Sequence, residues 1–350
     1  MAYTNIDDPS AHFQAFLYTG NGSNRTITLP GNSDLKFDLY WYKQRSQTGH
    51  HRMFDTSRGL SLELYPDLNA ADSAATYFNN QQANSFDIIA NDSATNTGDV
   101  TFANWQWKAN GGTTTSVSES QYNAGGTYQK NETAGFSIVS YTGIDTVGEV
   151  THGLTTQPQV VIVKRRNSTG NWATYHESAG ITGTLFLDTT AAKGNTTAYF
   201  HTGWGSATKF PIGSDADTNA DGATYVAYVF SERQGYSKFG SYVGNGNANG
   251  TFVYTGFKPA FIMVKTTAVS DEWNIYDTKR SGSNPNNDAL YASSNVVEDA
   301  GSTYAFMDMV SNGFKLRRAT HSPNKASTYI YMAFAEQPFV TSTGTPTTAR

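Results

Sequence analysis

The sequence places four oxygen-bearing side chains at alternate positions of one short segment, namely Asp215, Asp217, Asn219 and Asp221. Alternating carboxylate and amide oxygens are the ligands of a calcium-binding loop. A complete EF-hand loop would also carry glycine at its sixth position and an acid at its twelfth, where this chain has Ala220 and Val226. A calcium site is therefore one prediction for this segment, and a solvated turn between two strands is the other.

Two adjacent histidines, His50 and His51, form a second group that could do chemistry. Imidazole binds metals, exchanges protons near neutral pH and stacks on other rings. No third ligand is evident from the sequence. We therefore expect ring stacking or a surface hydrogen bond, with a metal-binding pair as the alternative.

Trp204 stands between two glycines in the segment HTGWGS and has no counterpart in the third copy of the repeat described below. Flat aromatic rings stack on sugar rings, and exposed ones mark binding surfaces. We predict that Trp204 makes an exposed contact with a binding partner. Trp172 and Trp273 occur in register in two related segments, which favours packing inside the fold.

Acidic residues such as Asp55, Asp271 and Glu272 could supply the carboxylate pair of a glycosidase, but the sequence gives no means of pairing them. No serine-nucleophile motif occurs, and the glycine-rich segment 244–250 is not followed by a helix, as a phosphate-binding loop would be. Cysteine is absent, which excludes disulfides and thiolate chemistry. We predict no enzymatic activity and no cofactor besides the possible calcium ion; a carbohydrate-binding module or glycan hydrolase is the alternative.

An internal repeat positions these residues. Three aligned pairs lie 101 residues apart in segments 136–178 and 238–278, namely Tyr141 and Tyr242, Lys164 and Lys265, and Trp172 and Trp273. A more diverged copy spans residues 16–57, where Lys43 matches the two lysines and His51 falls where the tryptophans stand. Such constancy indicates one structural unit used three times.

The composition favours β-structure. With 350 residues, of which 38% are hydrophobic, the chain can form two or three ordinary cores. Short apolar runs rich in Tyr, Phe and Val end at Gly, Asn or Pro about every 8 to 15 residues. We therefore predict an all-β protein of three tandem antiparallel β-sandwich modules of jelly-roll type.

The individual elements follow from the same pattern. Strands of the first copy are predicted at residues 15–19, 26–29, 37–43, 60–65 and 85–90. The strong closing runs of the three copies are predicted to be central, well-covered strands, at residues 101–108, 223–231 and 327–336. The best candidate for a helix is residues 68–77.

The predicted organisation has six parts: an N-terminal arm (1–13), module 1 (14–110), a linker (111–135), module 2 (136–232), module 3 (236–338) and a C-terminal tail (339–350). The linker is rich in Gly, Thr, Ser and Asn and is expected to be loosely attached. The arm and the tail need a partner surface to become ordered.

Lys43, Lys164 and Lys265 each close an apolar strand. Because all three copies keep a lysine there, we expect a structural role rather than ligand binding. The charge would reach solvent at the strand end, or discourage aggregation between sheets.

The net charge of −5 is spread without long runs and gives no reason to expect a nucleic-acid partner. The N-terminal segment carries acids where a secretion signal would be basic and then apolar, and no run of eighteen apolar residues occurs. We predict neither an export signal nor membrane insertion.

A recurring sequence motif runs through the copies: Tyr-Thr-Gly, a glycine-rich turn, Pro, an apolar strand ending in Lys, then Trp and an aromatic-Asp pair. Its members in the second copy are Tyr141-Thr142-Gly143, Pro158, Val160 to Lys164, Trp172, Tyr175 and His176, the last in place of the usual Asp. Over about residues 9–338 the chain resembles repeat modules of virion structural and tail-fibre-like proteins of tailed, especially aquatic, bacteriophages. The resemblance is one of scaffold and implies no catalytic residues.

The resemblance implies a non-enzymatic virion protein that is assembled in the host cytoplasm and exposed outside cells. We expect a tail-fibre or receptor-binding subunit, a homotrimer that attaches to a host-surface glycan or protein and to other virion proteins. The alternative is a capsid decoration or head-fibre protein whose arm or tail is held by the shell. Three like modules could also imitate a trimer within one chain.

Overall fold

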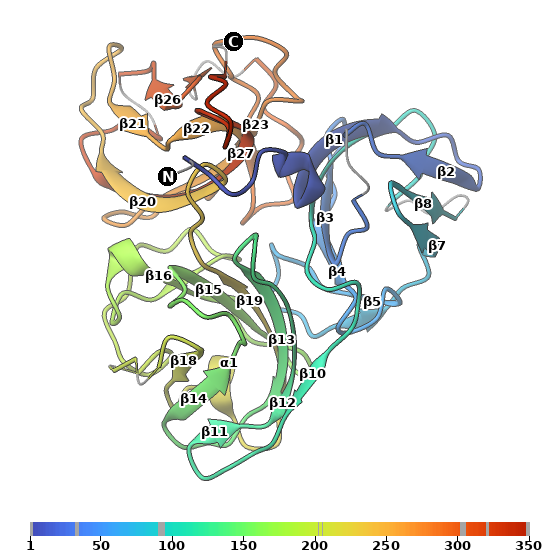
Figure 1. The fold of residues 1–350 in the computed structure, drawn as a ribbon, viewed down its shortest axis with the longest axis vertical. Coiled ribbons are helices and arrows are strands. Elements are labelled where there is room, and N and C mark those ends of the chain that lie inside the picture. Colours follow the sequence, from blue (N-terminus) through green and yellow to red (C-terminus); the bar gives the residue numbers. More distant parts are fainter. Residues whose placement is uncertain are drawn as a thin grey trace.

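The computed structural model describes residues 3–31, 35–89, 95–201, 203–204, 206–301, 306–319 and 322–347. The described chain is nearly all β, as predicted, and its sheets form three lobes around a common centre (Figure 1). We call them the first lobe (residues 13–107), the second lobe (115–230) and the third lobe (237–338).

The first lobe follows a short 3₁₀ helix, η1 (Pro9–Ala11). Its strands are β1 (Phe13–Thr19), β2 (Arg25–Thr28), β3 (Leu39–Gln44), β4 (Arg52–Asp55), β5 (Leu62–Glu63), β6 (Ser73–Ala74), β7 (Phe78–Gln82), β8 (Ser85–Ile88) and β9 (Thr101–Trp107). They form the sheets β1-β9-β3-β4 and β2-β8-β7 and the pair β5-β6. Side chains from the first two sheets share one buried cluster.

The second lobe is the largest. Its strands are β10 (Thr115–Val117), β11 (Asn123–Ala124), β12 (Gly126–Asn131), β13 (Phe136–Thr142), β14 (Gly148–Thr151), β15 (Val160–Arg165), β16 (Ala173–His176), β17 (Leu185–Phe186), β18 (Lys209–Ile212) and β19 (Thr224–Phe230). It also holds η2 (Glu177–Ala179) and a single helical turn, α1 (Ala216–Asn219). The sheets are β10-β12-β13-β19-β15-β16-β17 and β11-β14-β18.

The third lobe repeats this plan. Its strands are β20 (Ser237–Val243), β21 (Phe252–Tyr254), β22 (Phe257–Thr266), β23 (Asn274–Asp277), β24 (Leu290–Tyr291), β25 (Met307–Val310), β26 (Gly313–Leu316) and β27 (Thr328–Pro338). They form the sheets β20-β27-β22-β23-β24 and β21-β26-β25. The orders β1-β9-β3-β4, β13-β19-β15-β16 and β20-β27-β22-β23 are the same, so the sequence repeat is also a repeat of sheet topology.

The closing runs are central strands, which confirms that prediction: β9, β19 and β27 each pair with a strand on both sides. Strand β19 shows why they are apolar throughout. Tyr225, Ala227 and Val229 face the core of the second lobe, whereas Tyr228 and Phe230 face a cluster at the centre of the molecule. A strand covered on both faces needs apolar side chains at consecutive positions.

The central cluster joins the three lobes. It contains Trp105 from β9, Tyr228 from β19 and Phe334 from β27, all buried. The ring of Phe230 lies 6.3 Å from that of Trp107 and 5.7 Å from that of Phe334, measured between centroids. The three sheets of common strand order surround this core, an arrangement that we call pseudo-threefold, and the lobes depend on one another for burial (Figure 1).

The segment predicted as a linker instead builds part of the second lobe. Strand β12 pairs antiparallel with β13 over its whole length, and β11 pairs parallel with β14. The polar composition misled the prediction, because a strand added at a sheet edge is held mainly by its backbone hydrogen bonds and can keep polar side chains.

The helix predicted at residues 68–77 does not form. The backbone there is engaged by the second lobe: the Asn69 carbonyl accepts from the Gly170 amide at 2.9 Å, and the Asp72 amide donates to the Arg166 carbonyl at 2.9 Å. Contacts between lobes therefore override the local helix propensity of the alanines.

The arm and the tail find their partner surface on the chain itself. Ile6 is buried in the central cluster, and the Thr4 hydroxyl donates to the Gln234 carbonyl at 2.8 Å. The backbone amide of Ser342 in the tail donates to the Asp7 carboxylate at 2.6 Å. In Figure 1 both labelled ends lie beside the third lobe. Residues 1, 2 and 348–350 of the predicted arm and tail lie outside the described residues.

Candidate functional site

Of the residues that the repeat keeps in register, two lie in the cores of their own lobes, namely Tyr141 and Tyr242. The tryptophans lie at the seams, by which we mean the interfaces between neighbouring lobes. At the seam of the first and second lobes, Trp172 Nε1 donates to the Tyr65 carbonyl at 2.9 Å. At the next seam, Trp273 Nε1 donates to the Phe186 carbonyl, also at 2.9 Å. The same contact is thus made twice, from one lobe to the preceding one.

His51 closes the third seam in the way that the tryptophans close the others. Its Nδ1 accepts a hydrogen bond from Trp41 Nε1 at 2.9 Å, so the proton resides on Nε2. Nε2 then donates to the carbonyl of Tyr291 in the third lobe at 2.9 Å. Burial, and next the charge of Lys43, hold the pKa of His51 well below its usual value.

His50 has a different environment from His51. It is partly exposed, and its Nδ1 lies 2.7 Å from the Asp67 carboxylate. The other carboxylate oxygen of Asp67 accepts from the backbone amide of His51 at 3.1 Å. Asp67 therefore brings the pair together, but His51 uses both ring nitrogens inside the protein, which does not fit a metal-binding pair. The expected surface hydrogen bond describes His50 and not His51.

The three repeated lysines are buried, in contrast to the predicted solvent-facing charges. Lys164 Nζ donates to the Asn69 carbonyl of the first lobe at 3.3 Å, and Lys265 Nζ donates to the Thr190 carbonyl of the second lobe at 2.8 Å. Lys43 Nζ donates to the Gln44 carbonyl at 2.7 Å. The charge is satisfied by backbone carbonyls at the seams, which a single sequence copy does not reveal.

These lysines predict a stability that increases with pH in the alkaline range. Burial lowers the pKa of Lys43, Lys164 and Lys265 to about 8, against 10.5 in the unfolded chain. Between these values the unfolded state binds more protons, so the free energy of unfolding rises as pH increases from about 8 towards 10. Above about 10 it falls, because burial raises the pKa of tyrosines such as Tyr175 to about 12. Urea unfolding at stepped pH measures this; a monotonic fall from pH 8 would contradict it.

Closer to the centre, a second set of repeated positions joins the lobes. Asp55 accepts from the Tyr228 hydroxyl of the second lobe at 2.8 Å, and Asp277 accepts from Trp105 Nε1 of the first lobe at 3.1 Å. His176 occupies the equivalent place in the second lobe, and its Nε2 lies 3.1 Å from the Tyr331 carbonyl of the third lobe. Each lobe is thus tied to the next in the same direction around the centre.

The segment predicted as a calcium loop forms the helical turn α1 and its cap. The Asp215 carboxylate accepts from the backbone amide of Asp217 at 2.8 Å. The Asn219 side chain is buried and bonds to the backbone of Ile144, Thr146 and Gly213. Within the described chain, no three His, Asp or Glu side chains gather as metal ligands would. Asn219 therefore serves the fold, and only the end of the segment, at Asp221 and Gly222, is an exposed turn.

Trp204 is only partly exposed. Its ring centroid lies 5.3 Å from that of Tyr175, and it packs against the core of the second lobe. One part of the indole therefore has a structural role, and the remainder is available at the surface.

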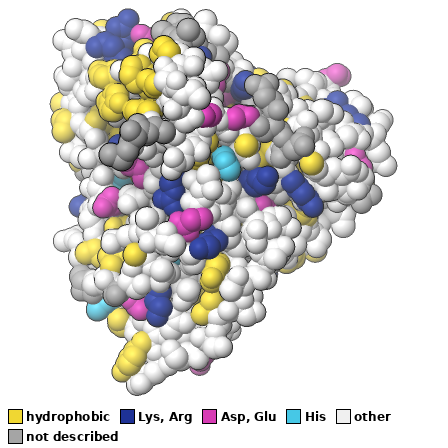
Figure 2. Space-filling view, viewed as in Figure 1, with side chains coloured by type: hydrophobic (Ala, Val, Ile, Leu, Met, Phe, Trp, Pro, Cys, Tyr) yellow, Lys and Arg dark blue, Asp and Glu magenta, His cyan; other side chains and the backbone are white. Residues whose placement is uncertain are grey.

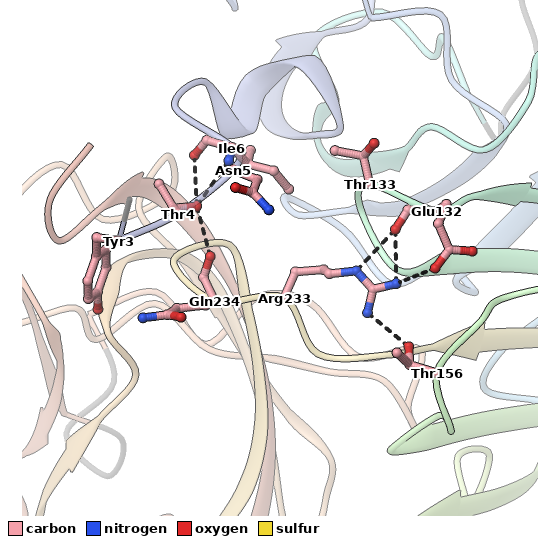
Figure 3. Close-up of a pocket in the computed structure, with 9 residues that line it drawn as sticks. All are labelled: Tyr3, Thr4, Asn5, Ile6, Glu132, Thr133, Thr156, Arg233 and Gln234. Carbon is pink, nitrogen blue, oxygen red and sulfur yellow. Dashed lines mark hydrogen bonds and ion pairs between the residues drawn. The ribbon is translucent and has the colours of Figure 1, made fainter. Parts of the chain in front are cut away.

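A surface pocket of about 460 Å³ lies where the arm meets the connection between the second and third lobes (Figure 3). Arg233 projects into it and donates to the Glu132 carbonyl and carboxylate and to the Thr156 hydroxyl. Tyr3 to Ile6 of the arm line it together with Gln234 of the connection, and Glu132, Thr133 and Thr156 line it from loops of the second lobe (Figure 3). The guanidinium is satisfied by the protein, so this pocket fits a role in holding the arm.

Residues 8–338 match a protein family described as a domain of unknown function (DUF7483). The chain belongs to the DUF7483 family. The match covers the three lobes together, from the end of the arm to the end of β27. No curated protein matches the chain. In the described part of this DUF7483 chain, no helix has the length and apolar character needed to cross a membrane.

Proposed function

We propose that this chain is a non-enzymatic structural protein of a tailed-bacteriophage virion, most specifically a tail-fibre or receptor-binding appendage subunit. The observation that carries the proposal is that the three lobes are joined at three seams into a closed ring around one shared core. Titratable side chains that could act in catalysis or binding, among them His51, Lys164 and Asp277, are buried at the seams and bonded to neighbouring lobes. Such placement serves assembly and rigidity.

The fold supports this proposal through its repeats. We propose that the three lobes are copies of one β-sandwich module, which agrees with their common sheet order and with the resemblance of the recurring sequence motif to phage modules. A rigid ring presents its loops and outer sheet edges at fixed positions, which suits a protein that contacts a host-surface glycan or protein. The outer part of Trp204 is one such surface.

The pseudo-threefold arrangement favours a second candidate, capsid decoration. A single chain with three like lobes can occupy a threefold position in an assembly without forming a homotrimer. The arm gives less support to decoration than the sequence suggested, because Ile6 is buried in the chain's own core.

Localisation in intact particles tests these proposals. Electron microscopy with a labelled antibody should place the protein on the tail for the first candidate and on the shell for the second, and its absence from particles would refute both. A mass measurement on the isolated protein separates a homotrimer from a single-chain ring. Binding or reducing-end release on a glycan panel would instead favour the carbohydrate-active alternative.

A further inference from the structure

The third lobe has an open sheet edge. In the second lobe the equivalent edge is covered by another segment of the chain. Strands β13 and β14 of the second lobe are flanked by β12 and β11, which belong to the covering segment, residues 122–131. In the described chain, the equivalent strands β20 and β21 of the third lobe are the terminal strands of their sheets. Because the lobes share one topology, the second lobe shows how such an edge can be occupied.

The covering segment contacts three particular positions of the second lobe. The Thr142 amide donates to the Gly125 carbonyl at 3.0 Å, and the Glu149 amide donates to the Tyr122 carbonyl at 2.8 Å. The Thr151 hydroxyl bonds to the side-chain oxygen of Asn123 at 3.1 Å. The strand pairings give the equivalent residues, because β14, β21 and β2 each pair a buried Val or Ile with a phenylalanine of the neighbouring strand. The equivalent residues of the third lobe are Val243, Phe252 and Tyr254, and those of the first lobe are Thr19, Thr26 and Thr28.

The third lobe is apolar where the other two are polar. Val243, Phe252 and Tyr254 are 64%, 46% and 52% exposed, and they are among the most exposed large hydrophobic residues of the described chain. Figure 2 shows hydrophobic side chains gathered over the part of the third lobe that carries β21. The threonines of the first lobe lie at an edge that water can cover, whereas three exposed apolar side chains beside open strand edges are a costly surface unless something packs on them. The chain makes two polar contacts here, since the Tyr254 hydroxyl lies 3.1 Å from that of Tyr3 and the Val243 carbonyl accepts from the Thr251 hydroxyl at 2.7 Å. The three apolar side chains nevertheless keep the exposed fractions given above.

We propose that this edge binds an extended segment of a partner protein, which adds a strand antiparallel to β20 and reaches β21 as residues 122–131 reach β14. Backbone hydrogen bonds would supply affinity, and alternate apolar side chains of the partner would pack on Phe252 and Tyr254. At the start of the edge the Phe239 amide already donates to the Glu232 carboxylate at 3.5 Å, so the segment pairs with the part of β20 that ends at Val243. The inference is independent of which assembly contains the protein.

The probe is a synthetic peptide with the sequence of residues 119–132, added to the full chain, in which the edge of the second lobe is already covered. We expect weak binding, with a Kd of roughly 10 to 100 µM by fluorescence anisotropy. A second peptide carrying Asn123→Leu should bind at least about fivefold more tightly, because position 123 would face Tyr254 instead of Thr151. Hydrogen exchange should slow in residues 241–243 when the peptide is bound.

The double variant Phe252→Glu/Tyr254→Thr gives the third lobe the residues of the second, and it should weaken binding at least about tenfold. Thr28→Glu, at the position of the first lobe that matches Tyr254, is the matched control and should leave binding unchanged. Both changes are at exposed positions, and a thermal melt checks that the variants fold. No binding at about 1 mM peptide, or equal binding to the double variant, would overturn the proposal. Self-association abolished by the double variant would also overturn it, by making a second copy the occupant.

Discussion

Replacing Asp277 with alanine is expected to lower the free energy of unfolding by roughly 3 to 5 kcal/mol. The carboxylate is buried, accepts from Arg280 Nε at 2.6 Å, and also accepts from the indole of Trp105 in the first lobe. Burial alone would raise the pKa of Asp277, but Arg280 and the hydrogen bonds hold it below the usual value. Without Asp277, the buried guanidinium keeps only Glu298 as an anionic partner, at 3.0 Å.

Urea unfolding followed by tryptophan fluorescence measures this effect. Because the three lobes share the central cluster, we expect one transition for the whole chain. Lys238→Ala is the control: it removes an ion pair with Glu232 whose side chains are 38% and 30% exposed, and it should cost less than about 1 kcal/mol. A similarly small loss for Asp277→Ala would show that the contact of Asp277 with Trp105 does not hold the first and third lobes together.

Acid is the second large perturbation that we expect. His176 and His152 are buried and neutral, and burial lowers the pKa of each to about 4, from 6.5 in the unfolded chain. Below pH 6.5 these histidines are protonated in the unfolded state but stay neutral in the folded state. The free energy of unfolding therefore decreases as pH falls from about 6.5 to 4. His176 alone should contribute on the order of 3 kcal/mol of this loss. His51, whose pKa burial also holds well below its usual value, acts in the same direction.

Three carboxylates of the described chain oppose this trend, because burial raises the pKa of Asp67, Asp188 and Asp217. Burial raises the pKa of Asp188 to about 6, so the folded state takes up a proton there before the unfolded state does, and this offsets about one histidine. The variant His176→Gln isolates the effect, since its amide can still donate towards the Tyr331 carbonyl but does not titrate. Between pH 6.5 and 4, its stability should fall less than that of the unmodified chain, by on the order of 3 kcal/mol. Parallel pH profiles for the two proteins would exclude His176 as a source of the acid sensitivity.

Much of the fold could be predicted from the sequence, because strand patterns and repeats are local signals. The all-β class and the central position of β9, β19 and β27 followed from alternation and from apolar runs. The linker prediction failed because the polar strands of that segment pair inside the second lobe, whereas two other failures share one physical cause, which is contact between lobes. Residues 68–77 lose their helix, and the lysines such as Lys164 are buried, because a neighbouring lobe supplies their hydrogen-bond partners. Sequence patterning within one copy does not show such contacts.

The candidate site was predicted less well for the same reason. The alignment marked His51 as the replacement for two tryptophans, but only the structure shows that it closes the third seam. The contribution of Asp277 and Arg280 was missed, although Asp55 and Arg58 repeat the same spacing and form the same buried pair in the first lobe. That recurring Asp-x-x-Arg spacing was a signal that could have been found.

The shared core also has a consequence for how this molecule can change over generations. In a homotrimer encoded by one gene, every substitution appears three times, so a feature gained on one subunit is imposed on the others. Here each lobe is encoded separately while its neighbours preserve the common centre. A covering segment can therefore arise on the second lobe and an apolar edge on the third. Fusion of the three copies frees each outer surface to diverge without loss of the ring.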